Sequence, residues 1–162
     1  MKINFKKVNP NIETHLPKYA TDGSAGLDIY ATSKYYDEFG CVCYGTNLAG
    51  KIPNGYVGLL FPRSSNSKKD LLLSNAVGVW DSDYTGEILF KFKPSLAFCQ
   101  HGISSISDNY EWIGEADEHF DYNIGDRIGQ LIIIPYPDIE PEWVDELPET
   151  IRGNKGWGST GN

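Results

Sequence analysis

Residues 77–88 have the sequence VGVWDSDYTGEI, in which two apolar runs flank a turn-forming centre. Asp, Ser, Thr and Gly are typical turn residues between strands, so this stretch predicts a β-hairpin. Two carboxylates and a tyrosine, Asp81, Asp83 and Tyr84, lie at the bend. These residues suit an ordinary turn, and they equally suit a carboxylate held beside a ligand, with the Tyr84 ring packed on a sugar or another ring.

Further short apolar runs lie on both sides of this stretch, and Gly, Pro, Asn or Asp separate them. Helical periodicity is scarce. Short runs bounded by turn residues predict an all-β fold, either a barrel or a sandwich. The best helix candidate covers residues 64–71 and would be only about two turns long. The predicted strands lie in residues 2–8, 27–31, 56–61, 71–73, 77–80, 88–92 and 131–134.

The composition is typical of one globular domain. The chain has 162 residues, of which 40% are hydrophobic and 13% aromatic, and a chain of this length can bury a core without disulfide or metal staples. The net charge of −8 argues against a general nucleic-acid binder, which usually has a basic surface. No run approaches the roughly 18 apolar residues of a membrane span. Three cysteines and the lack of a signal-peptide pattern predict reduced thiols and a cytoplasmic location.

Two stretches differ from the predicted strands. Residues 94–123 mix Cys, His, Trp, Ser and an acidic cluster, and we expect them to be an insert in a β-barrel domain formed by residues 1–134. Residues 135–151 contain four Pro and six acidic residues, which is typical of an extended connector. The last eleven residues, RGNKGWGSTGN, have no strand or helix signal. We therefore expect residues 135–162 to form a connector and a mobile C-terminal arm.

The arm also has the composition of a phosphate-binding loop. Its glycines free backbone N–H groups for an anion, and Ser159 and Thr160 add hydroxyl donors. Arg152 and Lys155 supply positive charge, and Trp157 offers a flat face for a base. A flexible glycine-rich C-terminus is the alternative interpretation of the same residues.

Three other segments carry polar residues in apolar surroundings. Ser64 and Ser65 follow an apolar run, where they could cap a helix or bind an anion. Asp28 lies within an apolar strand, and a buried carboxylate there needs a cation or a metal-bound water as its partner. Arg127 and Gln130 interrupt a core strand and must be satisfied by the structure or by a ligand.

Five segments of the chain resemble the motifs of the trimeric dUTPase family, both in their residues and in their order along the chain. They are TDGSAGLDIYA (21–31), PRSSNS (62–67), NAVGVWDSDYTGEI (75–88), GDRIGQLIII (125–134) and RGNKGWGSTG (152–161). The resemblance implies a jelly-roll subunit, a distorted β-barrel with one short helix, in a homotrimer whose active sites combine motifs from all three chains. It also implies Mg²⁺-dependent hydrolysis of dUTP to dUMP and pyrophosphate, which limits uracil incorporation into DNA and supplies dUMP for thymidylate synthesis.

On the nucleoside side, the resemblance makes Asp81 the residue that accepts the sugar 3′-OH and activates the attacking water. A positioned carboxylate base suits this step because water is a weak nucleophile at neutral pH. Tyr84 would pack under the deoxyribose and leave no room for a 2′-OH. Backbone groups near Asn75, Gly78 and Val79 would bind the uracil edge and exclude the thymine methyl group.

On the phosphate side, the resemblance places Ser64 and Ser65 at the α- and β-phosphates, and Gln130 at a further phosphate contact. Asp28 would orient water molecules on a Mg²⁺ ion that otherwise binds triphosphate oxygens. The arm would close over the site with Trp157 on the uracil and with Arg152, Gly158, Ser159 and Thr160 around the γ-phosphate.

The chain departs from the usual dUTPase motifs at two positions of the arm, and two other functions are alternatives to dUTP hydrolysis. Trp157 stands where the family usually has Phe, and Lys155 where it usually has Gly. The dCTP deaminases share the fold, but their catalytic Glu lies ten residues after the hairpin Asp, where this chain has Lys91, and a lysine cannot replace a carboxylate base. A regulatory or nucleotide-sensing trimer that uses the insert as an interface is the other alternative. A phage-encoded enzyme would act in the host cytoplasm.

Overall fold

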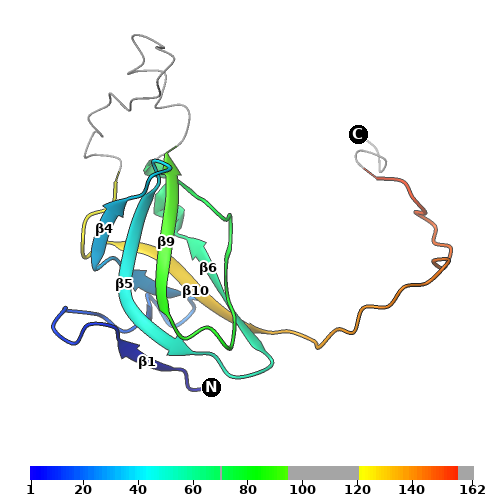
Figure 1. Ribbon diagram of the computed structural model, residues 1–162, viewed down its shortest axis with the longest axis horizontal. Coiled ribbons are helices and arrows are strands. Elements are labelled where there is room, and N and C mark those ends of the chain that lie inside the picture. Colours follow the sequence, from blue (N-terminus) through cyan, green and yellow to red (C-terminus); the bar gives the residue numbers. More distant parts are fainter. Residues whose placement is uncertain (70, 95–120, 157–162) are drawn as a thin grey trace, which may run out of the picture.

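The computed structural model describes residues 1–69, 71–94 and 121–156, and within these ranges the regular elements are strands and one short 3₁₀ helix (Figure 1). The strands form two antiparallel sheets. The first contains, in order, β1 (Asn4–Lys7), β5 (Val42–Lys51), β9 (Glu87–Pro94) and β7 (Leu71–Leu73), with β4 (Ser33–Tyr36) also paired to β5. The second contains, in order, β2 (Lys18–Tyr19), β3 (Leu27–Tyr30), β10 (Arg127–Pro135), β6 (Tyr56–Pro62) and β8 (Gly78–Trp80).

One hydrophobic core draws side chains from both sheets. Side chains alternate along β9, so that Ile88, Phe90 and Phe92 are buried while the residues between them are exposed, as the period of two along a strand requires. Phe90 packs directly on Gly129 of the second sheet, where an added Cβ would collide with the phenyl ring. Two antiparallel sheets around one core confirm the predicted all-β jelly roll.

The longest strand, β5, has no counterpart among the strands predicted from the sequence. Every residue from Val42 to Ala49 is buried, so the strand lacks the alternation of apolar and polar residues that marks a half-exposed strand. Cys43 of β5 and Cys41 just before it are buried free thiols. Cys99 lies outside the described residues.

The predicted helix over residues 64–71 is shorter than expected. The structure has a 3₁₀ helix, η1 (Ser64–Lys68), and Leu71 already belongs to β7. Arg63 at the N-cap position makes no side-chain capping bond, and η1 contains no buried residue. A single short 3₁₀ turn has little stability of its own, so its position depends on contacts with the rest of the fold. No helix in the described ranges is long and apolar enough to cross a membrane.

The predicted β-hairpin over residues 77–88 is wrong. β8 pairs with β6, where Gly78 lies opposite Leu60, whereas β9 pairs with β5 and β7. Residues 81–86, called the crossing segment below, therefore carry the chain from the second sheet to the first. Turn residues show where a chain bends, but packing against distant parts of the chain decides which strand each arm of the bend joins.

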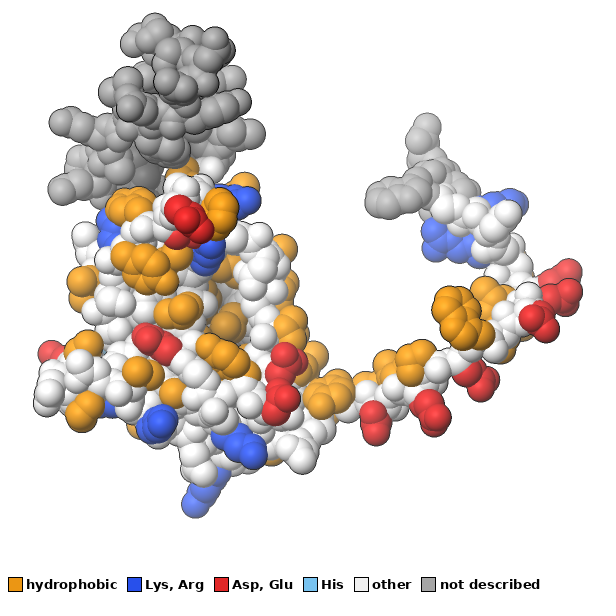
Figure 2. All heavy atoms as spheres, viewed as in Figure 1, with side chains coloured by type: hydrophobic (Ala, Val, Ile, Leu, Met, Phe, Trp, Pro, Cys, Tyr) orange, Lys and Arg blue, Asp and Glu red, His pale blue; other side chains and the backbone are white. Residues whose placement is uncertain are grey.

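The C-terminal arm extends away from the sandwich after β10. Its described part, residues 136–156, contains neither helix nor strand, and Figure 1 shows it leaving the sheets as a long, extended trace. Figure 2 shows apolar and acidic side chains exposed along it. The exposed apolar side chains include Ile139, Trp143, Leu147 and Ile151.

The end of the expected insert belongs to the core. Asp121 and Tyr122, which the sequence pattern groups with residues 94–123, are both buried. Tyr122 packs edge-on against Tyr44 of β5 and lies against Phe92 of β9. Residues 95–120 lie outside the described residues, and Pro94 is still part of β9.

Candidate functional site

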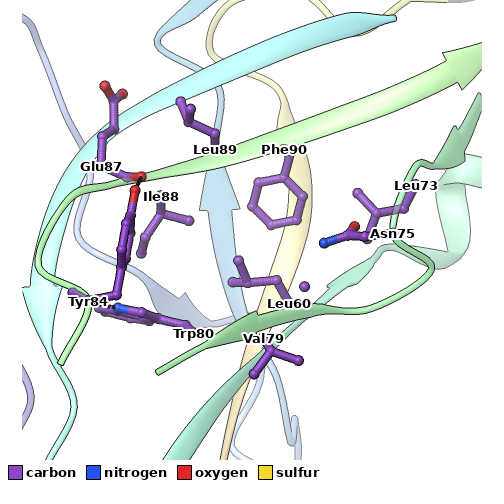
Figure 3. A pocket seen from close by; sticks show the side chains of 11 residues that line it. Leu60, Leu73, Asn75, Val79, Trp80, Tyr84, Glu87, Ile88, Leu89 and Phe90 are labelled. Carbon is purple, nitrogen blue, oxygen red and sulfur yellow. Dashed lines mark hydrogen bonds between the residues drawn. The ribbon is translucent and has the colours of Figure 1, made fainter. Parts of the chain in front are cut away.

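A pocket of about 180 Å³ opens between the two sheets beside the crossing segment (Figure 3). Its walls come from both sheets, with Leu60 of β6 on one side and Ile88 and Phe90 of β9 on the other. Apolar walls of this kind suit a flat ring. The predicted uracil-binding residues Asn75, Gly78 and Val79 and the predicted sugar-packing residue Tyr84 all line this inter-sheet pocket.

The segment between β7 and β8 bends tightly at the rim of the pocket. The N–H of Ala76 donates to the carbonyl of Leu73 over 2.9 Å, and Ala76 has a φ of 58°, a left-handed conformation that costs a non-glycine residue about 1–2 kcal/mol. Gly78 follows, and a Cβ there would lie 3.0 Å from the Cβ of Leu60. Glycine therefore lets β8 lie close to β6, and the bend leaves the Asn75 side chain facing the pocket (Figure 3).

Four contacts fix Tyr84 in the crossing segment. Its N–H donates to the carbonyl of Asp81 over 3.2 Å, and its own carbonyl accepts a hydrogen bond from Trp80 Nε1 over 3.0 Å. The Tyr84 hydroxyl donates to the carbonyl of Glu87 over 2.9 Å. The ring lies against Gly86, where a Cβ would come within 2.7 Å of the phenol carbon Cζ. The ring is thus held at the pocket although the residue is 48% exposed.

Asp81 is the first residue after β8 and is exposed to solvent. Its carbonyl closes the turn with Tyr84, and no group of the described residues hydrogen-bonds the carboxylate, which can therefore meet a ligand or a water. The structure therefore brings the predicted general base next to the predicted sugar-packing residue, on one short loop at the pocket.

A second group of polar residues, the Asp28 cluster, comprises Asp28, Arg63, Arg127 and Gln130. Asp28 on β3 is 5% exposed. Its Oδ1 accepts a hydrogen bond from Arg63 Nε over 2.8 Å, and its Oδ2 accepts one from Arg127 over 3.1 Å. Gln130 lies opposite Asp28 in the β10–β3 register and donates to the carbonyl of Pro62 over 3.3 Å. Two guanidinium groups around one carboxylate leave a net positive charge, which favours an anionic ligand.

The Asp28 cluster contains one carboxylate and does not form a metal site of protein ligands. In the described part of the chain, no group of three or more His, Cys, Asp or Glu residues could hold a metal ion. The partners of the buried Asp28 carboxylate are cations, as the sequence analysis allowed. Each oxygen keeps lone pairs that can accept a water, so Asp28 fits a Mg²⁺ ion held mainly by water and substrate phosphates.

Strand β6 connects the two groups. Leu60 pairs with Gly78 on one side of β6, and Phe61 pairs with Gln130 on the other. The chain then continues through Arg63 into η1, which begins with the exposed Ser64 and the half-buried Ser65. The predicted phosphate-binding serines thus directly follow the residue that binds Asp28.

The arm residues stand apart from both groups. Arg152 is exposed, and its Nε donates to the carbonyl of Lys155 over 3.0 Å. Gly153 between them has a φ of 55°. Trp157, Gly158, Ser159 and Thr160 lie outside the described residues. Within one chain, the structure therefore does not bring Arg152 to the pocket or to the Asp28 cluster.

Three residues that support the site had not been predicted from the sequence. The buried Asp28 requires a cation, but its pairing with Arg63 joins residues that are 35 positions apart. Trp80 and Ala76 gave no signal either, because their roles depend on hydrogen bonds to backbone carbonyls of the folded chain.

Comparison with known families agrees with the order of the motifs. The family model described as dUTPase matches residues 13–95 and 113–161. The chain belongs to the dUTPase family. The unmatched residues 96–112 fall within the stretch that we expected to be an insert, so the dUTPase match surrounds that stretch on both sides.

Curated relatives and solved structures with the same description resemble the chain over nearly its whole length. A deoxyuridine 5′-triphosphate nucleotidohydrolase of Gamma-proteobacterium EBAC31A08 is 36% identical and covers 90% of this chain and 94% of the relative. One of Burkholderia mallei (strain SAVP1) is 34% identical and covers 99% of both. A solved structure of a mutant dUTPase of Staphylococcus bacteriophage 80alpha with dUpNHpp superposes with a TM-score of 0.73 at 27% identity, over 99% of both chains.

A further solved structure concerns a metal ion. It is a mutant dUTPase from phage phi11 of S. aureus, described as revealing the coordination of a structural Mg(II) ion. It superposes with a TM-score of 0.66 at 25% identity and covers 90% of this chain and 98% of that one. Together with the family match, these likenesses confirm the dUTPase resemblance drawn from the five motifs.

Proposed function

We propose that this protein hydrolyses dUTP to dUMP and pyrophosphate. The observation that carries the proposal is the inter-sheet pocket, in which Asn75, Gly78, Val79 and Tyr84 converge beside Asp81 in a chain of the dUTPase family. An apolar slot with a few polar groups at its rim suits a pyrimidine base.

The nucleoside half of the reaction depends on the crossing segment. The base enters between Leu60 and Phe90, where backbone groups and Asn75 at the rim bind its edge. Tyr84 lies under the deoxyribose, and its four fixed contacts keep the ring from yielding to a 2′-OH. A rigid wall discriminates better than a mobile one, because accommodating the extra group requires breaking those contacts.

In the bond-breaking step, the carboxylate of Asp81 acts as the general base and accepts one proton. Its carboxylate accepts a hydrogen bond from the 3′-OH and takes a proton from a water whose oxygen attacks the α-phosphorus. The bond from that phosphorus to the bridging oxygen breaks, and pyrophosphate leaves with the electron pair. A positioned carboxylate contributes about 10²–10⁴-fold to such a step.

The Asp28 cluster and η1 bind the phosphates of the substrate. Arg63 and Arg127 carry positive charge, and Ser64, Ser65 and Gln130 add donors for the α- and β-phosphates. Asp28 would hold a Mg²⁺ ion through ion-bound waters, from which its remaining lone pairs could accept hydrogen bonds, and the ion would supply charge neutralisation for the triphosphate.

We further propose a homotrimer in which each site combines parts of three chains. The exposed apolar side chains along residues 136–156 support this assembly, because an isolated chain leaves them in water. The arm from one copy then brings Arg152, Gly158, Ser159 and Thr160 to the γ-phosphate of a site on another copy, and Trp157 to its uracil. The partners are thus dUTP and two further copies of the chain, in the cytoplasm or in the host cytoplasm for a phage-encoded protein.

Nucleotide turnover with Mg²⁺ tests the proposal. Pyrophosphate release is expected from dUTP, with far lower kcat/KM for dTTP, dCTP and UTP. Ammonia release from dCTP would instead indicate the deaminase reaction, and binding of dUTP without turnover would indicate a sensing protein. The ion pair of Lys91 with Asp37 argues against the deaminase, since that position holds a cation in place of the required carboxylate.

A further inference from the structure

Tyr122 connects the hydrophobic core to the turn that carries Ser65. It is 3% exposed, and its ring packs edge-on against Tyr44 with 5.9 Å between centroids and lies 5.8 Å from the ring of Phe92. Its N–H donates to the Tyr44 hydroxyl over 2.9 Å, and that hydroxyl donates to the carbonyl of Tyr122 over 3.2 Å. Both the ring and the backbone of Tyr122 are therefore fixed to the first sheet.

The hydroxyl of Tyr122 points from this anchor to η1. It donates to Asn66 Oδ1 over 3.0 Å, and Asn66 directly follows Ser65 within η1. Burial raises the pKa of Tyr122, so the phenol stays protonated and keeps its donor at neutral pH. Asn66 in turn donates to the carbonyl of Leu71, which ties η1 to the start of β7.

η1 has few other supports. It is a single 3₁₀ turn without a side-chain cap at Arg63 and without a buried residue. Ser64 is exposed, and within the described part of the chain Ser67 bonds only back to the carbonyl of Ser64, over 2.9 Å. A turn with so little internal stability takes its position from the groups that hold it from outside. One is the ion pair of Arg63 with Asp28 just before η1, and another is the Tyr122 hydroxyl on Asn66.

We infer that Tyr122 is a positioning residue for phosphate binding: its hydroxyl holds Asn66, and Asn66 fixes η1 so that the Ser65 hydroxyl meets the substrate's phosphates. This inference rests on the proposed function, in which Ser65 binds phosphate. It adds a residue outside the five motifs. A phenylalanine at position 122 would fill the same space in the core but would leave Asn66 Oδ1 without this donor.

The test compares Tyr122→Phe with Tyr36→Phe. Tyr36 donates its hydroxyl to the side chain of Asp121, so the control removes a phenol hydroxyl next to Tyr122 without touching η1. Binding of dUpNHpp with Mg²⁺ and of deoxyuridine, which has no phosphate, is measured by titration calorimetry on folded trimers. Tyr122→Phe is expected to weaken dUpNHpp binding about 5- to 10-fold, the size of one lost hydrogen bond, and deoxyuridine binding less than twofold, whereas Tyr36→Phe leaves both within twofold.

A double-mutant cycle shows whether the hydroxyl acts through Ser65. In the Ser65→Ala background, adding Tyr122→Phe is expected to weaken dUpNHpp binding less than twofold further, because the group that it positions is already gone. Full additivity, unchanged dUpNHpp binding by Tyr122→Phe, or equal weakening of both ligands would each overturn the positioning role while leaving the proposed function intact. An unmodified protein that binds no dUpNHpp would overturn the proposed function, and the positioning role with it.

Discussion

Asp81 is the residue on which the proposed chemistry depends most directly. It is exposed at the start of the crossing segment, and its backbone carbonyl, not its carboxylate, closes the turn with Tyr84. The side chain therefore contributes little to the fold, so its loss should affect catalysis and leave stability nearly unchanged.

Asp81→Asn is expected to preserve folding and dUTP binding and to lower kcat by about 10²–10⁴-fold, because an amide cannot accept the water's proton. Steady-state kinetics with a thermal unfolding curve separates the two effects. A kcat close to that of the unmodified protein would show that another group is the base.

Tyr84 provides the matching prediction for specificity. Tyr84→Ala removes the wall beneath the sugar and is expected to raise kcat/KM for UTP relative to dUTP. Tyr84→Phe keeps the ring and loses only the bond to the carbonyl of Glu87, so it should retain most of the discrimination. If the dUTP/UTP ratio in Tyr84→Ala equals that of the unmodified protein, selection against the 2′-OH lies elsewhere.

At the scale of elements, strand positions could be predicted from local patterns, whereas strand partners could not. Apolar runs bounded by turn residues mark β6, β9 and β10 within a few residues of their observed bounds. β5 was not predicted because it is buried on both sides and lacks an alternating pattern. The predicted hairpin is wrong because β8 and β9 join different sheets. The ion pair of Asp28 with Arg63 spans 35 residues, which no local pattern reveals.

The crossing segment depends on Trp80, whose indole N–H holds the carbonyl of Tyr84. Trp80→Phe loses this hydrogen bond and part of a buried ring, and should destabilise the protein by about 1–3 kcal/mol. It should also lower the dUTP/UTP discrimination, because Tyr84 loses one of its supports. Trp143→Phe is the control, since Trp143 is fully exposed on the arm. Urea denaturation of both variants checks the stability, and equal midpoints would contradict a role for Trp80.

At the scale of the whole molecule, the sandwich and the arm have separate roles in the proposed enzyme. The family motifs indicate which residues take part, but a single chain leaves them in separate groups: the inter-sheet pocket, the Asp28 cluster and the arm. In the proposed trimer, neighbouring copies bring these groups together. The geometry of such an assembly cannot be predicted from the order of the motifs or from the strand pattern of one chain.

Deletion of residues 152–162 is expected to leave the oligomer intact and to lower kcat sharply, because closure over the site excludes water and fixes the α-phosphate for attack. Size-exclusion chromatography with light scattering gives the oligomeric state, and turnover of dUTP gives the effect on catalysis. A truncated protein that works at the full rate would remove the arm from the proposed mechanism.

The crossing segment has a consequence for how this protein can evolve. Because residues 81–86 connect two sheets, the walls of the inter-sheet pocket belong to different sheets, and the width of the slot is set by their separation, about 10 Å for face-to-face packing. If the pocket holds the base as proposed, a change deep in the interior that spreads the sheets is expected to alter which pyrimidine fits, even at residues that no ligand touches. Selection for one base would then constrain the apolar interior more tightly than thermodynamic stability alone requires.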